Sequence, residues 1–175
     1  MLNLKSFTEE IILSIKKIEF SKLDISEYNR NYIQNMFPHI NYYFKIYAEA
    51  IIRLVNDSIP ADYIVDFGGG HGFLSIFLKR LGFNVVYCDH NPLSVKAITL
   101  LKNEIGYGPD IIIEGSTSEL LHYCKNNNIL PKYLIATDLI EHVYDLNKLF
   151  SDLYTLNPDF SMVFTTGSVK SNLLK

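Results

Sequence analysis

The sequence predicts an α/β fold, a doubly wound parallel sheet preceded by a helical cap, and three observations carry this prediction. Residues 1–60 show helical periodicity and no strand signal. From Ala61 onward, short apolar runs alternate with amphipathic segments, which is typical of a parallel sheet covered by helices on both faces. A glycine-rich turn, Gly68 to Gly72, separates the first strand from the first helix of that series. We therefore expect a cap over 1–60 and a sheet domain over 61–175.

The cap should contain three helices. Apolar residues over 6–20 recur at spacings of three and four, as on one face of an amphipathic helix. A second short helix, capped by Asp24 or Ser26, should end before Pro38, and a third should cover about 39–56. We expect the cap to pack on the sheet domain or to fold over its ligand edge.

The cap is also rich in tyrosine. Six of the twelve tyrosines of the chain fall between Tyr28 and Tyr63. Packing between helices accounts for most such rings, but an aromatic ring with a polar tip also suits a wall that is apolar on one side and wet on the other. We therefore expect the cap to contribute tyrosines to the ligand edge of the sheet.

The sheet domain should contain five strands joined by right-handed helical crossovers. The expected strands cover 63–67, 84–89, 111–113, 132–137 and 160–166. The helices between them have recognisable end signals. The first should end at Gly82, and the second should begin at Asn91 with Pro92 and end at Gly106. Ser116 or Ser118 should cap the third, and the fourth should cover about 146–156. A ligand should lie outside the carboxyl ends of these strands.

The composition excludes several classes of protein. The chain has 175 residues, 48% of them hydrophobic and 20% charged, which is an ordinary balance for one globular domain and excludes disorder. Sixteen basic and nineteen acidic residues give a net charge of -3, so we expect neither a nucleic-acid nor a membrane partner, and a small or neutral substrate is favoured. Cys88 and Cys124 lack metal-type spacing, and no apolar run is long enough for a membrane span. These features predict a soluble, cytoplasmic protein.

The glycine turn carries the first functional motif. Phe73 stands where a dinucleotide fingerprint beginning at Gly68 would need Gly or Ala, which disfavours a nicotinamide dehydrogenase. The alternative pattern, an acid followed by x-G-x-G-x-G, is complete, with Asp66 before Gly68, Gly70 and Gly72. It resembles motif I of the class I S-adenosylmethionine-dependent methyltransferases. The resemblance implies a Rossmann-like fold and S-adenosyl-L-methionine as cofactor, held by these four residues.

A second motif supports the same resemblance. Asp89 ends the second expected strand, seventeen residues after Gly72. In the resembling family an acid at this place holds both ribose hydroxyls, and an ionised carboxylate can indeed accept from both donors of a vicinal diol. His90 follows directly and is a further candidate for cofactor binding. Ser116 or Thr117, after the third strand, could contact adenine as a hydroxyl where the family often has an acid.

The third motif runs from Asp138 to Val143, D-L-I-E-H-V, and resembles the D/E-x-x-E-H-V form of many small-molecule methyltransferases. We expect Asp138 to contact the cofactor and His142 to act as general base or substrate contact, oriented by Asp138 and Glu141. The same residues also resemble the metal-binding E-x-x-E-H of small-RNA 2′-O-methyltransferases. That site needs another histidine further along, and none follows His142, so we favour the reading without metal.

The resemblance implies an enzyme that transfers a methyl group to a small-molecule acceptor by in-line displacement. The alternative is a module that binds S-adenosylmethionine without catalysis, for example as a regulator. The family has two more strands after the fifth, whereas nine residues follow Thr166 here. We therefore expect either a sheet that is truncated after its fifth strand, with the remaining strands in a further C-terminal region of a longer protein, or an unusually short member whose sheet edge is covered by something else, and we favour the first.

Overall fold

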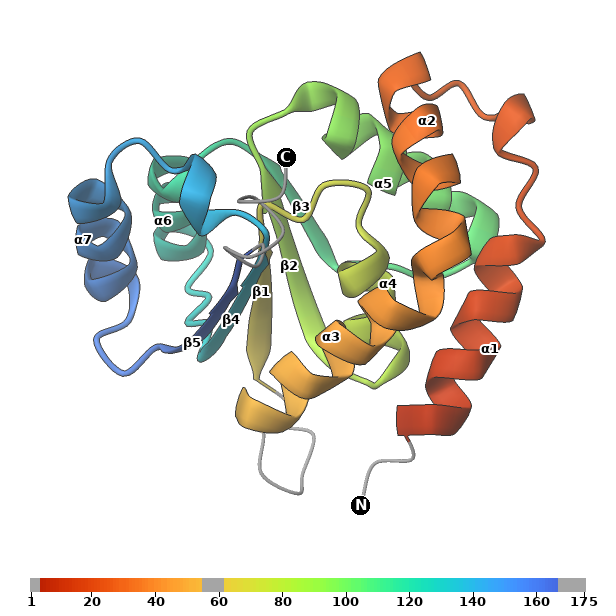
Figure 1. Ribbon diagram of the computed structural model, residues 1–175. Coiled ribbons are helices and arrows are strands. Elements are labelled where there is room, and N and C mark those ends of the chain that lie inside the picture. The colour runs from red at the N-terminus through yellow and green to blue at the C-terminus, as the bar shows by residue number, and fades with distance from the viewer. Residues whose placement is uncertain (1–3, 55–61, 167–175) are drawn as a thin grey trace, which may run out of the picture.

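The computed structural model describes residues 4–54 and 62–166, which form a helical region followed by a five-stranded sheet (Figure 1). The helical region contains α1 (Leu4–Lys16), α2 (Glu27–Met36) and α3 (Ile40–Leu54), with short 3-10 turns at Phe20–Lys22 and Phe37–His39. Ser26 caps α2 by accepting a hydrogen bond of 3.1 Å from the Asn29 amide. The prediction of a helical N-terminal region is confirmed for the described residues.

The sheet alternates strictly with helices. Its elements in chain order are β1 (Tyr63–Phe67), α4 (Phe73–Arg80), β2 (Asn84–Asp89), α5 (Pro92–Ile105), β3 (Ile111–Glu114), α6 (Thr117–Asn126), β4 (Tyr133–Thr137), the 3-10 turn η3 (Ile140–His142), α7 (Leu146–Leu156) and β5 (Ser161–Thr165). All neighbouring strands are parallel, in the order β3-β2-β1-β4-β5. The Rossmann-like, doubly wound prediction is therefore confirmed, and every strand boundary lies within one residue of its expected place.

The strand order reverses between β1 and β4, so the crevice at this point is where an open α/β sheet binds its ligand. Helices cover both faces (Figure 1), with α1 to α5 on one side and α6 and α7 on the other. Consecutive strand residues point to opposite faces, so Val85 and Tyr87 enter the first core while Val86 and Cys88 enter the second. Both cores are therefore built from the same short strands.

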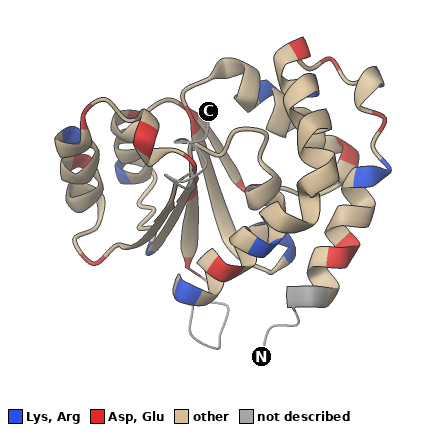
Figure 2. Cartoon of the chain, viewed as in Figure 1, with Lys and Arg blue, Asp and Glu red and all other residues tan. Residues whose placement is uncertain are grey.

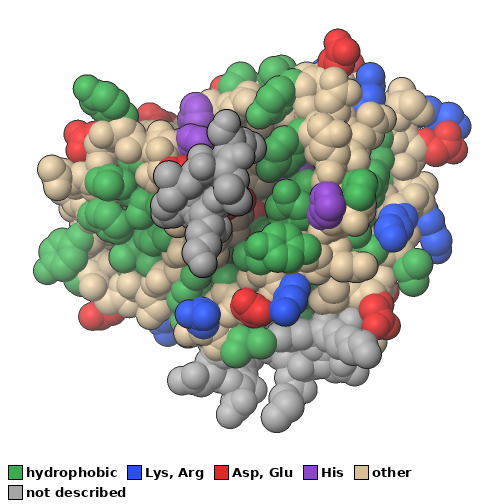
Figure 3. All heavy atoms as spheres, viewed as in Figure 1, with side chains coloured by type: hydrophobic (Ala, Val, Ile, Leu, Met, Phe, Trp, Pro, Cys, Tyr) green, Lys and Arg blue, Asp and Glu red, His purple; other side chains and the backbone are tan. Residues whose placement is uncertain are grey.

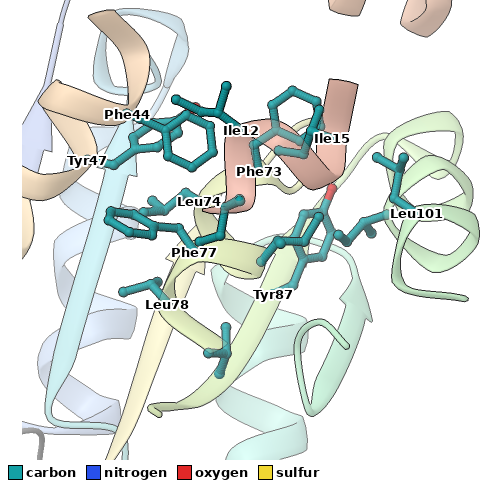
Figure 4. Close-up of a cluster of buried hydrophobic side chains, with 14 of the residues drawn as sticks. Ile12, Ile15, Phe44, Tyr47, Phe73, Leu74, Phe77, Leu78, Tyr87 and Leu101 are labelled. Atoms are coloured by element: carbon teal, nitrogen blue, oxygen red, sulfur yellow. The ribbon is translucent and has the colours of Figure 1, made fainter. Parts of the chain in front are cut away.

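The cap is part of the first core. Phe44 of α3 lies 5.4 Å from Phe77 of α4, measured between ring centroids, and both rings are fully buried. Figure 4 shows labelled side chains of α1, α3 and α4 in one cluster with Tyr87 of β2. Each such buried side chain contributes roughly 1.5–3 kcal/mol to folding. Because the cap and the sheet share this core, the cap is held in a fixed place beside the sheet.

Charges are spread over the surface. In Figure 2, basic and acidic residues are interspersed along the outer helices. None of the described helices is both long enough and apolar enough to cross a bilayer.

Candidate functional site

The glycine turn after β1 needs its glycines for two different reasons. Gly68, Gly70 and Gly72 have φ values of 68°, 53° and 81°, in the left-handed region that favours glycine. A Cβ on Gly72 would overlap the Ile98 side chain of α5, so this glycine also permits close helix packing. A Cβ on Gly70 would meet nothing within 4 Å, so the tip of the turn faces open space that a ligand can enter.

Asp89 lies directly across from that tip. Its Oδ2 accepts a hydrogen bond of 2.8 Å from the Gly70 amide, and its Oδ1 accepts one of 2.8 Å from the Asn91 amide. The side chain is buried, yet each oxygen keeps a second lone pair that could accept from a ligand hydroxyl. Asp89 thus joins the first and second sequence motifs into one structural unit.

Two cavities meet at this unit. The apolar cavity has a volume of about 260 Å³ and is walled chiefly by Phe67, Leu139, Val143 and Leu149. The tyrosine cavity has a volume of about 330 Å³ and lies between the glycine turn and the cap, whose Tyr28, Tyr32, Tyr43 and Tyr47 line it. Four residues line both cavities, namely Gly68, Asp89, His90 and His142. In Figure 3, hydrophobic side chains gather beside α2 and α3 on this face.

The prediction that the cap contributes tyrosines to the ligand edge is confirmed by this geometry. The sequence did not distinguish these rings from packing residues such as Phe44, because both recur at helical spacing. The residues of the apolar cavity were also missed, although Leu139 and Val143 stand inside the third motif. No composition signal marks an apolar side chain as a cavity wall.

Ser116 and Thr117 line the apolar cavity, but the protons of both hydroxyls are used within the fold. Ser116 Oγ donates to Glu119 Oε2 at 2.6 Å as part of a capping box at the start of α6. Thr117 Oγ1 donates to Asp152 Oδ2 at 2.6 Å and so ties α6 to α7. Their oxygens can still accept, which is the role that an amino group of a purine would require.

Asp66 lies beneath the glycine turn and lines neither cavity. Its Oδ2 accepts a hydrogen bond of 2.7 Å from Ser75 Oγ, and its buried Oδ1 has no partner among the described residues. Burial raises the pKa of this carboxyl to about 7, although the Ser75 hydrogen bond opposes the shift. The cofactor contact of Asp66 stays a prediction, and within the fold its carboxyl lies under the turn and accepts from Ser75.

His71 connects the glycine turn to the cap. Its ring stacks on Phe73 at a centroid distance of 4.2 Å, meets Tyr32 edge-on at 5.4 Å, and contacts the sulfur of Met36 through Nε2. Burial lowers the pKa of His71 to about 4, so the imidazole is neutral at physiological pH. The sequence placed His71 beside the motif but gave no sign of its contact with the cap.

The third motif spans η3, and its side chains lie in different surroundings. Asp138, with φ of 50°, lines the tyrosine cavity, and its amide donates to the Thr165 carbonyl at 3.0 Å. Burial raises the pKa of Asp138, Glu141 raises it further, and His142 lowers it, so the three side chains lie near one another. His142 lines both cavities, whereas Glu141 lines neither. Within 4–54 and 62–166, no three His, Cys, Asp or Glu residues form a group that could hold a metal ion.

Comparison with known proteins gives a likeness in fold. No protein-family model matches the chain, and no curated protein matches it. Among solved structures, the C-terminal domain of precorrin-6Y C5,15-methyltransferase from Rhodobacter capsulatus has a TM-score of 0.54 at 16% identity and covers 75% of this chain. PH0226 protein from Pyrococcus horikoshii OT3 has a TM-score of 0.53 at 20% identity and covers 85%.

A mutant of MtNAS in complex with S-adenosylmethionine has a TM-score of 0.54 at 15% identity and covers 92% of the chain. The matches cover 66%, 59% and 55% of those three structures in the order given, so this chain spans only part of the length of the proteins that it is similar to. The strand order, the helices on both faces and these neighbours together show that the chain has the fold of class I S-adenosylmethionine-dependent methyltransferases.

Proposed function

We propose that the protein is an S-adenosylmethionine-dependent methyltransferase that acts on a small molecule. The observation that carries the proposal is the position of Asp89. Its carboxylate stands where the apolar cavity, the tyrosine cavity and the tip of the glycine turn meet. One end of this site suits a purine, its middle suits a diol, and its other end is open to a second ligand.

The residues present fit S-adenosylmethionine. The apolar cavity would hold the adenine between Leu139, Val143 and Phe67, with Thr117 as an acceptor at its edge. Asp89 would accept from the ribose hydroxyls, and the methionine part would run past Gly68 and Gly70 toward the tyrosine cavity. When bound, this donor supplies a methyl group on a sulfonium centre whose leaving group is a neutral thioether.

The residues around the tyrosine cavity would then orient the acceptor and exclude water. The cap closes one side of the cavity with Tyr32, Tyr43 and Tyr47, and this shielding is a condition for efficient transfer from a sulfonium. His142 borders both cavities, so its imidazole can take a proton from an acceptor that sits beside the donor. These are the roles that we assign to the cap and to His142.

The second candidate is a module that binds S-adenosylmethionine without transferring its methyl group. Such a module would have the same donor site as the enzyme. The two functions differ only in whether the tyrosine cavity binds an acceptor that receives the methyl group. A dehydrogenase is disfavoured because Phe73 stands where the dinucleotide fingerprint that begins at Gly68 needs Gly or Ala.

Two measurements test the proposal. Calorimetric titration with S-adenosylhomocysteine, S-adenosylmethionine and NAD should show binding of the adenosyl ligands in preference to NAD, and tighter binding of NAD would overturn the cofactor assignment. Incubation with methyl-labelled donor and a panel of small acceptors should then give labelled product and S-adenosylhomocysteine. Release of methylthioadenosine would show that a different carbon–sulfur bond is cleaved, and binding without turnover across the panel would favour the non-catalytic module.

A further inference from the structure

We propose that the tyrosine cavity binds its acceptor through a cationic amine group, with Asp138 as the counter-ion and the cap tyrosines as the surrounding aromatic wall. This inference rests on the proposed function for the identity of the ligand in the neighbouring apolar cavity. It concerns the chemical class of the acceptor, which the fold does not specify. Its basis is the charge and the aromatic content of the cavity wall.

The part of the cavity wall that residues 4–54 and 62–166 form contains negative charge and no lysine or arginine. Among the described residues that line it, two are aspartates, Asp89 and Asp138, and none is lysine or arginine. An acceptor that binds through a phosphate or a carboxylate would therefore find no lysine or arginine to pair with among the described lining residues. An ammonium group would be attracted to these carboxylates, since a negative charge stabilises a cation close to it.

Two basic residues on the helices that frame the cavity bind other groups of the protein. Arg30 of α2 donates to the backbone carbonyls of Phe20 and Leu23, at 3.3 Å and 3.0 Å. Lys96 of α5 forms a salt bridge of 2.7 Å with Asp24. Neither of these two cations lines the cavity, so neither supplies the charge that an anionic acceptor would need.

Of the three histidines that line the cavity, the one that contacts the cap adds no positive charge. His71 is buried against Phe73 and Met36, and burial lowers its pKa to about 4, so it contributes no charge. Asp138 is exposed and lines the cavity, and within 4–54 and 62–166 partial desolvation and the negative charge of Glu141 raise the pKa of its carboxyl while His142 lowers it. Asp138 is thus a carboxylate on the cavity wall that a cation in the cavity could approach.

The aromatic wall gives a second, independent reason. Tyr28 and Tyr32 stack at a centroid distance of 6.4 Å, and Tyr47 is 4% exposed at the base of the cavity. Burial raises the pKa of Tyr47 well above its ordinary value, and Tyr32, Tyr43 and Asp138 line the same cavity. Tyrosine faces attract cations, and a ring of them is a known way to recognise ammonium groups.

Three probes with the same ring and similar chains test the inference, namely phenethylamine, phenethyl alcohol and hydrocinnamate. Each is titrated calorimetrically into the free protein and into the protein saturated with S-adenosylhomocysteine. Phenethylamine should bind roughly tenfold or more tightly than hydrocinnamate, with the alcohol between them. Asp138→Asn, which keeps a residue that tolerates positive φ, should remove most of this preference. Glu49→Gln, a change at an exposed acid of α3 outside the cavity, should leave it unchanged.

The tyrosine contribution is separated by a pair of variants. Tyr32→Phe keeps the ring and should keep the amine affinity, whereas Tyr32→Leu should weaken it several-fold. Equal or tighter binding of hydrocinnamate, or no binding of the amine to either form of the protein, would overturn the inference. Because S-adenosylhomocysteine is titrated separately, loss of its binding would count against the proposed function alone, and the amine preference of the free protein would still decide the inference.

Discussion

The Gly70 amide donates a hydrogen bond of 2.8 Å to Oδ2 of Asp89, so the tip of the turn after β1 is fixed to the end of β2. Two motifs that stand apart in the sequence are therefore one object in the structure. A ligand held by the carboxylate of Asp89 must also lie against the glycine backbone. Loss of the carboxylate should consequently weaken ligand binding and loosen the turn together.

Asp89→Asn should weaken binding of S-adenosylhomocysteine by about 1.5–3 kcal/mol, the range for hydrogen bonds to a charged group. The affinity is measured by calorimetry, and thermal melting confirms that the variant is folded. Asp110→Asn is a matched control, because Asp110 accepts a 2.8 Å hydrogen bond from the Val85 amide at the opposite edge of the sheet. An unchanged affinity in folded Asp89→Asn would remove this residue from the site.

Asp66 and His71 should give opposite pH dependences of folding stability. The pKa of Asp66 is raised from 3.8 to about 7, so its contribution is fully present below pH 3.8 and is lost as the pH rises toward 7. The pKa of His71 is lowered from 6.5 to about 4, so its contribution is present above pH 6.5 and is lost as the pH falls toward 4. At about 1.4 kcal/mol for each unit, the two effects are about 4 and about 3 kcal/mol and largely cancel.

Single variants remove this cancellation. Asp66→Asn leaves only the histidine effect, so its unfolding free energy should fall more steeply than that of the parent protein between about pH 6.5 and about pH 4.5. His71→Gln leaves only the aspartate effect and should show the reverse slope. Urea unfolding at the two pH values measures both, with His39→Gln, a change at an exposed histidine, as control. If the unfolding free energy changes equally with pH in the parent protein and in all three variants, the burial effects assigned to Asp66 and His71 are contradicted.

The sequence predicted well those features that depend on local signals. Asn91 caps α5 with Pro92 as the first helical residue, and Gly106 ends that helix in the left-handed conformation, all as expected. Ser116 forms a capping box with Glu119, whereas Ser118 does not serve as the cap. Such positions are determined by the few residues around them, so a single sequence is enough to find them.

Features that depend on distant parts of the chain could not be predicted. The contact of His71 with Met36 joins residues 35 positions apart, and no local pattern records it. Asp66 completes the glycine motif in sequence, yet strand alternation points its side chain beneath the turn and toward Ser75. Glu141 and His142 are neighbours in sequence, but the turn of η3 places only His142 on the cavities.

Gly72→Ala should destabilise the fold more than Gly106→Ala. The two glycines have φ values of 81° and 83°, so an alanine at either place costs about 1–2 kcal/mol for the left-handed backbone. Only at Gly72 would the new Cβ also overlap Ile98, and such overpacking costs roughly 1–3 kcal/mol more. Urea unfolding of both variants measures the difference. Equal losses would mean that α5 moves away from the turn without cost.

His142 and Glu141 should differ sharply in their effect on turnover. His142 lines both cavities, so its imidazole can reach an acceptor beside the donor, whereas Glu141 lines neither cavity and adds negative charge near Asp138. With an acceptor from the panel, His142→Gln should lower kcat by roughly a hundredfold or more if the imidazole is the base. Glu141→Gln should change kcat by only about twofold, in keeping with the small effect of a surface charge.

The affinity for S-adenosylhomocysteine separates catalysis from binding in the same variants. The donor contacts assigned to Asp89 and to the glycine turn do not involve His142, so the affinity of His142→Gln should stay close to that of the parent protein. A loss of affinity that equals the loss of kcat would make His142 a binding residue. Activity that a chelator abolishes and a divalent ion restores would instead make the imidazole a metal ligand, and the base assignment would then be wrong.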